Sequence, residues 1–193
     1  MTTLAGKTLF ITGASRGMGL AMAQQLLQPT DTLLCISRSE APALQGAADT
    51  AGCTLLQWQH DLADGAGAAE RPREWRQRKS LDDFGSATLI KNAGVLPRIA
   101  PLSESDADEL TKALRVGLEA PMLLTSAFLG ETEHWLVPRK VLNISSGLGR
   151  RAMASQAAYC AAKAGMDHFT RCAALDEARQ ALAIGKDDFV IGV

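Results

Sequence analysis

The chain of 193 residues has few aromatic side chains, almost no net charge and no long apolar run. Aromatic residues make up 5% of it, with a single tyrosine, and the formal net charge at pH 7 is −1. A nearly neutral chain lacks the basic surface on which nucleic-acid-binding proteins hold phosphates. No stretch approaches the roughly 20 apolar residues that span a bilayer, and no signal-peptide pattern opens the chain. These absences predict no nucleic-acid partner, no membrane partner and a cytoplasmic location.

Cysteine usage excludes two further classes. The four cysteines, Cys35, Cys53, Cys160 and Cys172, show neither a Cys-x-x-Cys pair nor metal-ligand spacing. Such spacing gives no sign of a zinc site or of a disulfide framework, so we expect reduced, buried thiols and no metal. The one basic cluster, residues 70–79, has glutamates among its arginines and only one aromatic residue, which favours a solvated helix face.

Strand-like and helix-like stretches alternate along the chain. Apolar runs predict strands at residues 8–12, 32–37, 54–60, 88–91 and 140–144, and periodicity predicts helices at 17–28, 68–79, 105–128 and 154–178. The Gly/Ala-rich residues 63–69 are the nearest thing to a linker. This order is typical of an α/β fold with a doubly wound parallel sheet and helices on both faces. With 47% hydrophobic residues the chain can bury one substantial core, so we expect a single domain over residues 1–193.

A glycine-rich turn follows the first predicted strand. Gly13, Gly17 and Gly19 stand between that strand and an apolar helical pattern. Glycine turns the backbone tightly and lets a diphosphate approach the new helix, whose first N–H groups are free to bind phosphate. At the start of a βαβ unit this arrangement predicts a dinucleotide site. The alternative is a tight turn that binds no ligand.

Charge at the end of the second strand indicates which dinucleotide binds. An acidic residue there would bind the ribose hydroxyls of NAD, but the strand ends in Ser37-Arg38. Arg38, and Arg16 inside the glycine turn, can both pair with the 2′-phosphate of NADP by charge-assisted hydrogen bonds. The sequence therefore predicts NADP(H) in preference to NAD(H). The alternative is that both arginines are merely exposed charges.

Three residues near the C-terminal end form a candidate catalytic set. The only tyrosine, Tyr159, precedes Lys163 by four residues, so the two side chains lie on one face of a helix. A nearby ammonium favours the phenolate, so this tyrosine can act as general acid for reducing a carbonyl or as base for oxidising an alcohol. Ser146, at the end of a strand, can donate a hydrogen bond to the developing alkoxide. The alternative is a tyrosine and a lysine on a solvated helix face.

Together these motifs resemble the short-chain dehydrogenase/reductase family. The resemblance covers residues 5–178 and rests on TGASRGMG at 12–19, NAG at 92–94, NISSG at 143–147 and YCAAK at 159–163. Residues 117–125 and 158–167 are most similar to the sepiapterin reductase and benzil reductase branch of NADPH-dependent carbonyl reductases. The family implies a Rossmann fold, hydride transfer from the nicotinamide, and a homodimer or homotetramer. It also implies that Tyr159 is the acid/base, that Lys163 binds the ribose and lowers the tyrosine pKa, and that Ser146 orients the substrate.

The resemblance further implies that Asp61, followed by Leu62, lies beside the adenine and that residues 92–94 line the cofactor. The full cofactor-binding prediction is Gly13, Ser15, Arg16, Gly17, Met18, Gly19, Ser37, Arg38, Asp61, Leu62, Asn92, Ala93, Gly94, Tyr159 and Lys163.

Three features depart from the family pattern. Gly117 stands where the family commonly has an asparagine that supports a proton relay to the lysine. Lys91 replaces a second asparagine before Asn92 and puts a cation at the end of a buried strand. The chain ends in what we expect to be the sixth strand, so the fold would be C-terminally truncated and would lack the segment that covers substrate.

The leading hypothesis is an NADPH-dependent carbonyl reductase acting on a small ketone or alcohol. Gly117 and the short C-terminus leave two alternatives open. One is a catalytically impaired dinucleotide-binding protein, and the other is a truncated family member that acts through association.

Overall fold

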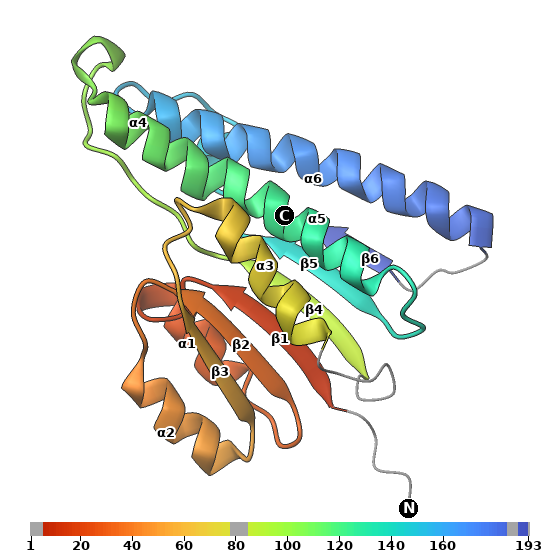
Figure 1. The fold of residues 1–193 in the computed structure, drawn as a ribbon. Coiled ribbons are helices and arrows are strands. Elements are labelled where there is room, and N and C mark those ends of the chain that lie inside the picture. The colour runs from red at the N-terminus through yellow and green to blue at the C-terminus, as the bar shows by residue number, and fades with distance from the viewer. Residues whose placement is uncertain (1–5, 78–84, 185–188, 193) are drawn as a thin grey trace, which may run out of the picture.

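A computed structural model describes residues 6–77, 85–184 and 189–192. At its centre is a six-stranded parallel sheet in the order β3-β2-β1-β4-β5-β6 (Figure 1). The strands are β1 (Lys7–Thr12), β2 (Thr32–Ser37), β3 (Thr54–Gln59), β4 (Ser86–Lys91), β5 (Arg139–Asn143) and β6 (Phe189–Gly192). The strand order reverses between β1 and β4, which is the doubly wound, Rossmann-like topology. The predicted fold class is confirmed.

Helices lie on both sides of this sheet. One face packs against α1 (Gly17–Gln25) and α2 (Pro42–Ala51), and the other against α3 (Gly65–Arg76), α5 (Ala120–Thr132) and α6 (Ala157–Ile184) (Figure 1). The shorter elements are the 3-10 helix η2 (Leu102–Glu104), α4 (Ala107–Leu114), the π-helical turn η3 (Arg115–Glu119) and the 3-10 helix η4 (Gly147–Gly149). Right-handed crossovers explain the division, because the chain moves outward from β1 to β3 and then in the opposite direction from β4 to β6. Within the described ranges, no helix has the length and apolarity needed to cross a membrane.

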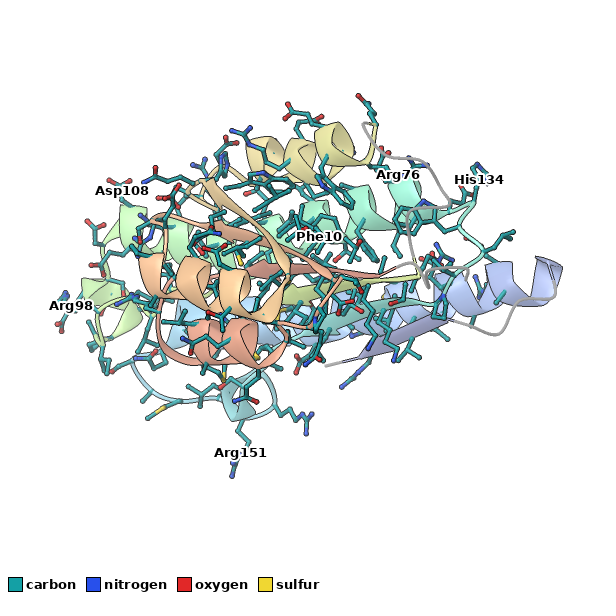
Figure 2. All side chains as sticks on the ribbon, turned by 90° about the horizontal axis from the view of Figure 1, so that it is seen from below. Phe10, Arg76, Arg98, Asp108, His134 and Arg151 are labelled. Carbon is teal, nitrogen blue, oxygen red and sulfur yellow. The ribbon has the colours of Figure 1, made fainter. Side chains whose placement is uncertain are left out.

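The two faces of the sheet have separate apolar cores. On the α1 and α2 side, Ile11 and Leu33 pack with helix residues such as Leu44. On the other side Phe10 meets Phe128 of α5, with ring centroids 6.1 Å apart in an edge-on arrangement. Figure 2 shows Phe10 between the sheet and these helices. Neighbouring strand residues point to opposite faces, so the apolar run of β1 supplies both cores.

Two sequence expectations are wrong because small residues form helices here. Residues 42–51, for which no helix was expected, form α2, whose buried face consists of Leu44 and Ala48. Residues 63–69 are not a linker, since α3 begins at Gly65 with the Asp64 side chain accepting a hydrogen bond from the N–H of Gly67. Alanine and glycine give a weak apolar periodicity but allow close packing against a neighbour.

The expected cover of both sheet faces is also wrong for the last strands. Val141 and Asn143 of β5 are buried, but the alternate residue Leu142 is 37% exposed. Val190 of β6, which pairs in register with Lys140, is 57% exposed. Among the described helices, those beyond β4 cover only the α5 and α6 side. The start of a sixth strand, by contrast, is confirmed by β6.

Surface features follow the sequence in part. Arg73 pairs with Glu70 and Arg71 with Glu74 along α3, which fits a solvated helix face, while Arg78 and Lys79 lie outside the described residues. All four cysteines are free thiols. Cys35 and Cys53 are buried, and burial raises the pKa of the Cys35 thiol to about 12. Cys160 is partly exposed and Cys172 is exposed, so the expectation that all the thiols are buried is wrong.

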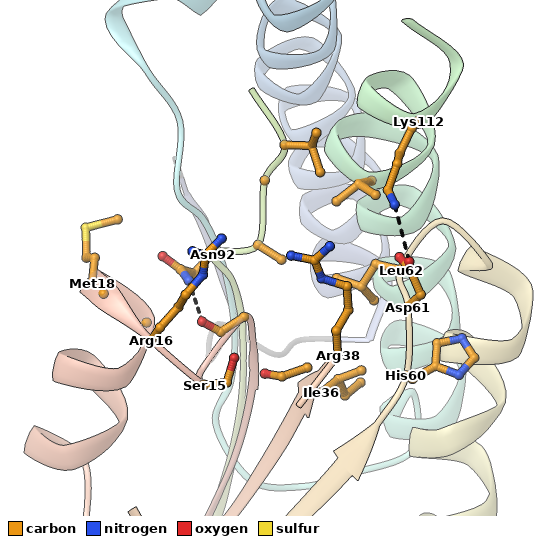
Figure 3. A pocket seen from close by; sticks show the side chains of 18 residues that line it. Ser15, Arg16, Met18, Ile36, Arg38, His60, Asp61, Leu62, Asn92 and Lys112 are labelled. Carbon is orange, nitrogen blue, oxygen red and sulfur yellow. Dashed lines mark hydrogen bonds and ion pairs between the residues drawn. The ribbon is translucent and has the colours of Figure 1, made fainter. Parts of the chain in front are cut away.

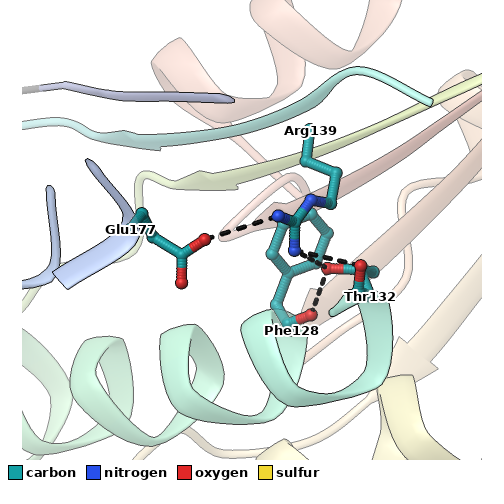
Figure 4. Close-up of polar contacts among 4 residues, drawn as sticks. All are labelled: Phe128, Thr132, Arg139 and Glu177. Atoms are coloured by element: carbon teal, nitrogen blue, oxygen red, sulfur yellow. Dashed lines mark hydrogen bonds and ion pairs between the residues drawn. The ribbon is translucent and has the colours of Figure 1, made fainter. Parts of the chain in front are cut away.

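A polar clasp made by Thr132, Arg139 and Glu177 lies at the N-terminal end of β5. The Arg139 guanidinium donates to the backbone carbonyl of Thr132 at 3.0 Å and lies 3.4 Å from the carboxylate of Glu177 (Figure 4). Both side chains are largely buried. The clasp joins the C-terminal end of α5, the first residue of β5 and α6.

Candidate active site

A cavity of about 530 Å³ lies at the carboxyl ends of β1 to β4 (Figure 3). It is the point where the strand order reverses, which is where doubly wound sheets bind ligands. The lining includes Gly13, Ser15, Arg16, Gly17, Met18, Gly19, Ser37, Arg38, Asp61, Leu62, Asn92, Ala93 and Gly94. The fold thus brings the predicted cofactor residues of four segments together. Tyr159 and Lys163 are not among the residues that line this cavity.

The shape of the turn depends on glycine. Gly13 and Gly17 have φ angles of 72° and 56°, in the left-handed region that other residues rarely adopt. A Cβ added to Gly19 would lie 2.1 Å from the carbonyl oxygen of Gly13, so only glycine allows α1 to start this close to the strand end. The N–H of Gly13 donates to the carbonyl of Ile36 at 2.9 Å, which fixes the turn against β2.

Thr12 joins the turn to β4, a role that the sequence analysis missed. Its buried Oγ1 accepts hydrogen bonds from the N–H groups of Asn92 and Ala93, each at 3.1 Å. The Asn92 side chain returns bonds to the carbonyls of Thr12 and Gly13 at 3.2 and 3.3 Å. These contacts connect residues about 80 positions apart, and the only local signal was a hydroxyl residue at the end of an apolar strand.

Cations outnumber acids around the cavity. Arg16, Arg38 and Lys112 line it together with Asp61 (Figure 3). The Lys112 ammonium lies 3.5 Å from the Asp61 carboxylate. The backbone N–H of Ala63, helped by the charges of Lys112 and Arg38, holds the pKa of Asp61 below its usual range. Lys112 was not predicted from the sequence, since it comes from α4 and no spacing pattern links it to Asp61.

The described residues fit a dinucleotide. The N-cap residue of α1, Arg16, makes no side-chain capping hydrogen bond, so the first N–H groups of the helix are available to an anion. A Cβ position on Gly17 meets nothing within 4 Å, so the backbone is open to a ligand there. The cavity volume lies within the range of about 300–1,000 Å³ that is usual for ligand pockets. A phosphate-bearing ligand would have both backbone donors and arginine charges beside it.

The three predicted catalytic residues come from adjoining elements. Ser146 caps η4, where its Oγ accepts a hydrogen bond from the N–H of Leu148 at 3.2 Å, and η4 packs against α6. Tyr159 and Lys163 lie one turn apart on α6, with the lysine Nζ 5.8 Å from the centroid of the tyrosine ring. The Lys163 side chain is buried and donates to the carbonyl of Ile144 at 2.6 Å. Burial lowers the pKa of Lys163, and the nearby charge of Asp167 acts in the opposite direction.

The model of the short chain dehydrogenase family matches residues 7–185. The chain belongs to this family. It is 34% identical over 185 residues to a benzil reductase, (S)-benzoin forming, of Bacillus cereus, a match that covers 96% of this chain and 74% of the relative. A sepiapterin reductase of Xenopus laevis is 30% identical over 181 residues, covering 86% of this chain and 67% of that protein. The resemblance to this branch of the family is confirmed.

A solved structure adds to this likeness. A metagenomic short-chain oxidoreductase crystallised with NADP is 30% identical and superposes with a TM-score of 0.79, covering 92% of this chain and 77% of that one. Membership of the family makes the chain an oxidoreductase of the type that acts on CH–OH and C=O groups.

Two departures from the family motif are explained by packing. Gly117 lies in the π-helical turn η3, and a Cβ there would come within 2.9 Å of the Cβ of Ala162. The glycine therefore lets η3 pack tightly on α6 directly beside Lys163. π-turns of this kind are frequent at functional sites.

Lys91 contacts no acidic side chain among the residues that the structure describes. Its side chain is 2% exposed, and its ammonium donates to the Thr125 hydroxyl and, at 3.3 Å, to the carbonyl of Pro121. The ring of Phe169 lies 5.4 Å from the ammonium. Because burial disfavours the charged form, the pKa of Lys91 is lowered to about 7. The fold tolerates this lysine by giving it oxygen acceptors and an aromatic face.

Proposed function

We propose that this protein is an NADP(H)-dependent carbonyl reductase, with Ser146, Tyr159 and Lys163 as its catalytic residues. The observation that carries the proposal is the placing of Tyr159 and the buried Lys163 on one face of α6, next to the element that Ser146 caps. NADPH, when bound, supplies the hydride that reduces the carbonyl carbon. Its phosphates would be held by the glycine turn and the start of α1.

The preference for NADP(H) rests on two arginines. Arg16 and Arg38 both line the cavity, one from the glycine turn and one from the end of β2. In the described cavity wall, no carboxylate follows β2 at the position where the ribose hydroxyls of NAD would be bound. Two guanidinium groups favour a ligand with an additional phosphate. The NADP complex of the 30% identical relative is consistent with this choice.

Proton transfer falls to Tyr159. A phenol on a helix face beside a lysine can donate a proton to the oxygen of a ketone as its carbon is reduced. Ser146 Oγ, at the element that packs against α6, would donate a hydrogen bond to the same oxygen. The Lys163 ammonium stabilises the phenolate that remains. The relatives' names point to small ketones and diketones, and benzil is the first probe to use.

The decisive experiment measures NADPH oxidation by the purified protein with benzil and other small ketones, alongside Tyr159→Phe. We expect turnover by the natural sequence and a loss of about 10²- to 10⁴-fold in the variant, which is the usual contribution of a general acid. NADPH binding, followed by fluorescence, should be the same in both. Turnover that survives in Tyr159→Phe would contradict the proposed acid. If the folded protein binds NADPH but never turns over, the dinucleotide-binding alternative is favoured.

A further inference from the structure

Asp167 stands apart from the other carboxylates of the molecule because it is buried beside the proposed catalytic residues. Its side chain is 4% exposed and it follows Lys163 by one turn of α6. One carboxylate oxygen, Oδ1, accepts a hydrogen bond from the hydroxyl of Ser145, the residue before Ser146. The other, Oδ2, is buried and has no hydrogen-bond partner among the described residues. A buried carboxylate in this state is costly unless a cation lies nearby.

The loop after β5 is shaped to meet this carboxylate. A Cβ added to Gly149 would lie 2.9 Å from Asp167 Oδ2 and 3.2 Å from the backbone carbonyl of Lys163. A side chain at this position would be crowded, so glycine lets the loop rest closely on α6 between these two residues. The Ser145 bond and this contact together tie the segment that carries Ser146 to the helix that carries Tyr159 and Lys163.

Lys163, one turn earlier on α6, is a cation on which the charge of Asp167 acts. Residues four apart on a helix are neighbours, and the charge of Asp167 opposes the effect of burial on the lysine pKa. The other ionisable groups on α6 near Lys163 and on the elements around it are Tyr159, Cys160, His168, Lys91, Asp108, Glu109, Lys112, Arg115, Glu119, Arg150 and Arg151.

These other charged groups either contact other side chains or are exposed to solvent. The Lys91 ammonium points to Thr125, and Lys112 pairs with Asp61. The remaining charged groups are exposed, and Figure 2 shows Arg151 pointing away from the body of the protein. Asp167 is thus the buried negative charge available to Lys163, in a chain whose Gly117 has no side chain for the family's relay.

We propose that Asp167 is a positioning residue of the active site: it keeps Lys163 protonated and holds the Ser145–Ser146 segment against α6. This inference rests on the proposed function, in which a charged Lys163 promotes ionisation of Tyr159. The carboxylate touches neither of the proposed reacting hydroxyls, so its effect on the tyrosine passes through the lysine.

The test uses the fact that Tyr159 is the only tyrosine of the chain. Its ionisation can be followed directly by the ultraviolet absorbance of phenolate during a pH titration, without substrate or turnover. In Asp167→Asn the lysine loses the charge that supports its proton, so it becomes neutral at lower pH. We expect the midpoint of the phenolate absorbance to move to higher pH than in the natural sequence. A midpoint that stays in place or moves lower would overturn the proposal.

Glu177→Gln is the matched control. It also neutralises a buried carboxylate on α6, but Glu177 faces Arg139 in the clasp, ten residues beyond Asp167 (Figure 4). We expect no movement of the Tyr159 midpoint in this variant. Ser145→Ala, which removes the hydrogen bond but keeps the charge, should also leave the midpoint in place. An equal movement in Glu177→Gln would assign the effect to general destabilisation and would contradict the proposal.

The pH dependence of turnover provides a second test of the proposal. If the natural sequence reduces benzil, the high-pH limb of its rate profile, where Tyr159 loses the proton that it donates, should move to higher pH in Asp167→Asn together with the absorbance midpoint. If the natural sequence shows no turnover, the proposed function fails while the absorbance titration still decides the role of Asp167. Should Asp167→Asn not fold, the smaller neutral variant Asp167→Ser is titrated instead. Failure of both to fold would show a purely structural carboxylate and overturn the proposal.

Discussion

The two halves of the sheet form their parts of the candidate site in different ways. We call the half around β1, β2 and β3 the nucleotide half, and the half around β4, β5 and β6 the buried-charge half. Around β1, β2 and β3, the site is made by backbone shape: positive φ angles, a close approach at Gly19 and free N–H groups at the start of α1. Around β4, β5 and β6, it is made by buried polar side chains under α5 and α6, among them Lys91, Asn143, Lys163 and Asp167.

This difference indicates which kind of substitution disrupts each half. The glycine turn is disrupted when atoms are added at Gly19, since there is no space for a Cβ at that position. A buried charge fails when its partner is removed, because an uncompensated charge in a low-dielectric interior is costly. We therefore expect substitutions in the first half to act mainly on cofactor binding, and those in the second to act mainly on titration, turnover and stability.

The largest effect expected in the nucleotide half comes from Gly19→Ala. The added Cβ would lie 2.1 Å from the Gly13 carbonyl and 2.4 Å from the Asn92 side chain, so the turn has to move. We expect NADPH affinity to fall about a hundredfold, the equivalent of roughly 3 kcal/mol of overpacking. Fluorescence titration with NADPH measures this change.

Gly46→Ala is the control for that substitution. Gly46 lies on the exposed face of α2, where an added Cβ meets nothing within 4 Å. It should leave NADPH affinity unchanged and raise the free energy of unfolding by about 0.5–1 kcal/mol, as alanine does within helices. Unchanged NADPH affinity in Gly19→Ala would show that backbone shape is not what forms the nucleotide half.

A smaller effect is expected from Arg38→Glu. The new carboxylate would repel a 2′-phosphate, so NADPH should bind about tenfold more weakly or worse, while NADH affinity changes little. The ratio of the two dissociation constants is the measurement. Arg171→Glu, an exposed reversal on α6, should leave that ratio as it is. Equal losses for both dinucleotides in Arg38→Glu would contradict 2′-phosphate recognition.

An effect on stability alone, in the half of the sheet around β4, β5 and β6, is expected from Lys91. Its pKa of about 7 in the folded protein lies below the ordinary 10.5, so between these values the folded protein binds fewer protons than the unfolded chain. Stability is therefore expected to rise with pH from about 7 upward, by at most about 1.4 kcal/mol per pH unit, and to be lost as the pH falls toward 7.

Lys91→Met tests this expectation. It removes the buried charge and leaves the Thr125 hydroxyl its bond to the Pro121 carbonyl at 2.6 Å. We expect the variant to be about 1–3 kcal/mol more stable at pH 7 and to lose the pH slope between 7 and 9. Urea unfolding at several pH values measures both. A slope that persists in the variant would mean that another group titrates, and NADPH affinity should be unaffected in either case.

Much of this architecture was predictable from local patterns. The strands came from apolar runs, the glycine turn from residues 13–19, and the Tyr159 and Lys163 pair from helical spacing, because each signal lies within a few consecutive residues. The helix α2 was missed because its buried face consists of only Leu44 and Ala48. Thr12 and Lys112 were missed because their partners lie about 80 and 51 positions away.

The sequence by itself determined the parallel α/β order, the dinucleotide turn and the type of chemistry, since local spacing is enough to specify a turn or one face of a helix. Only the tertiary structure decided that Lys91 is buried with no acidic partner in the described part of the chain, that Gly117 packs on Ala162, and that Asp167 binds Ser145 beside Ser146. These features depend on which elements meet across the sheet. Burial sets the free-energy cost of each charge, and it depends on how several elements pack together and not on any single segment.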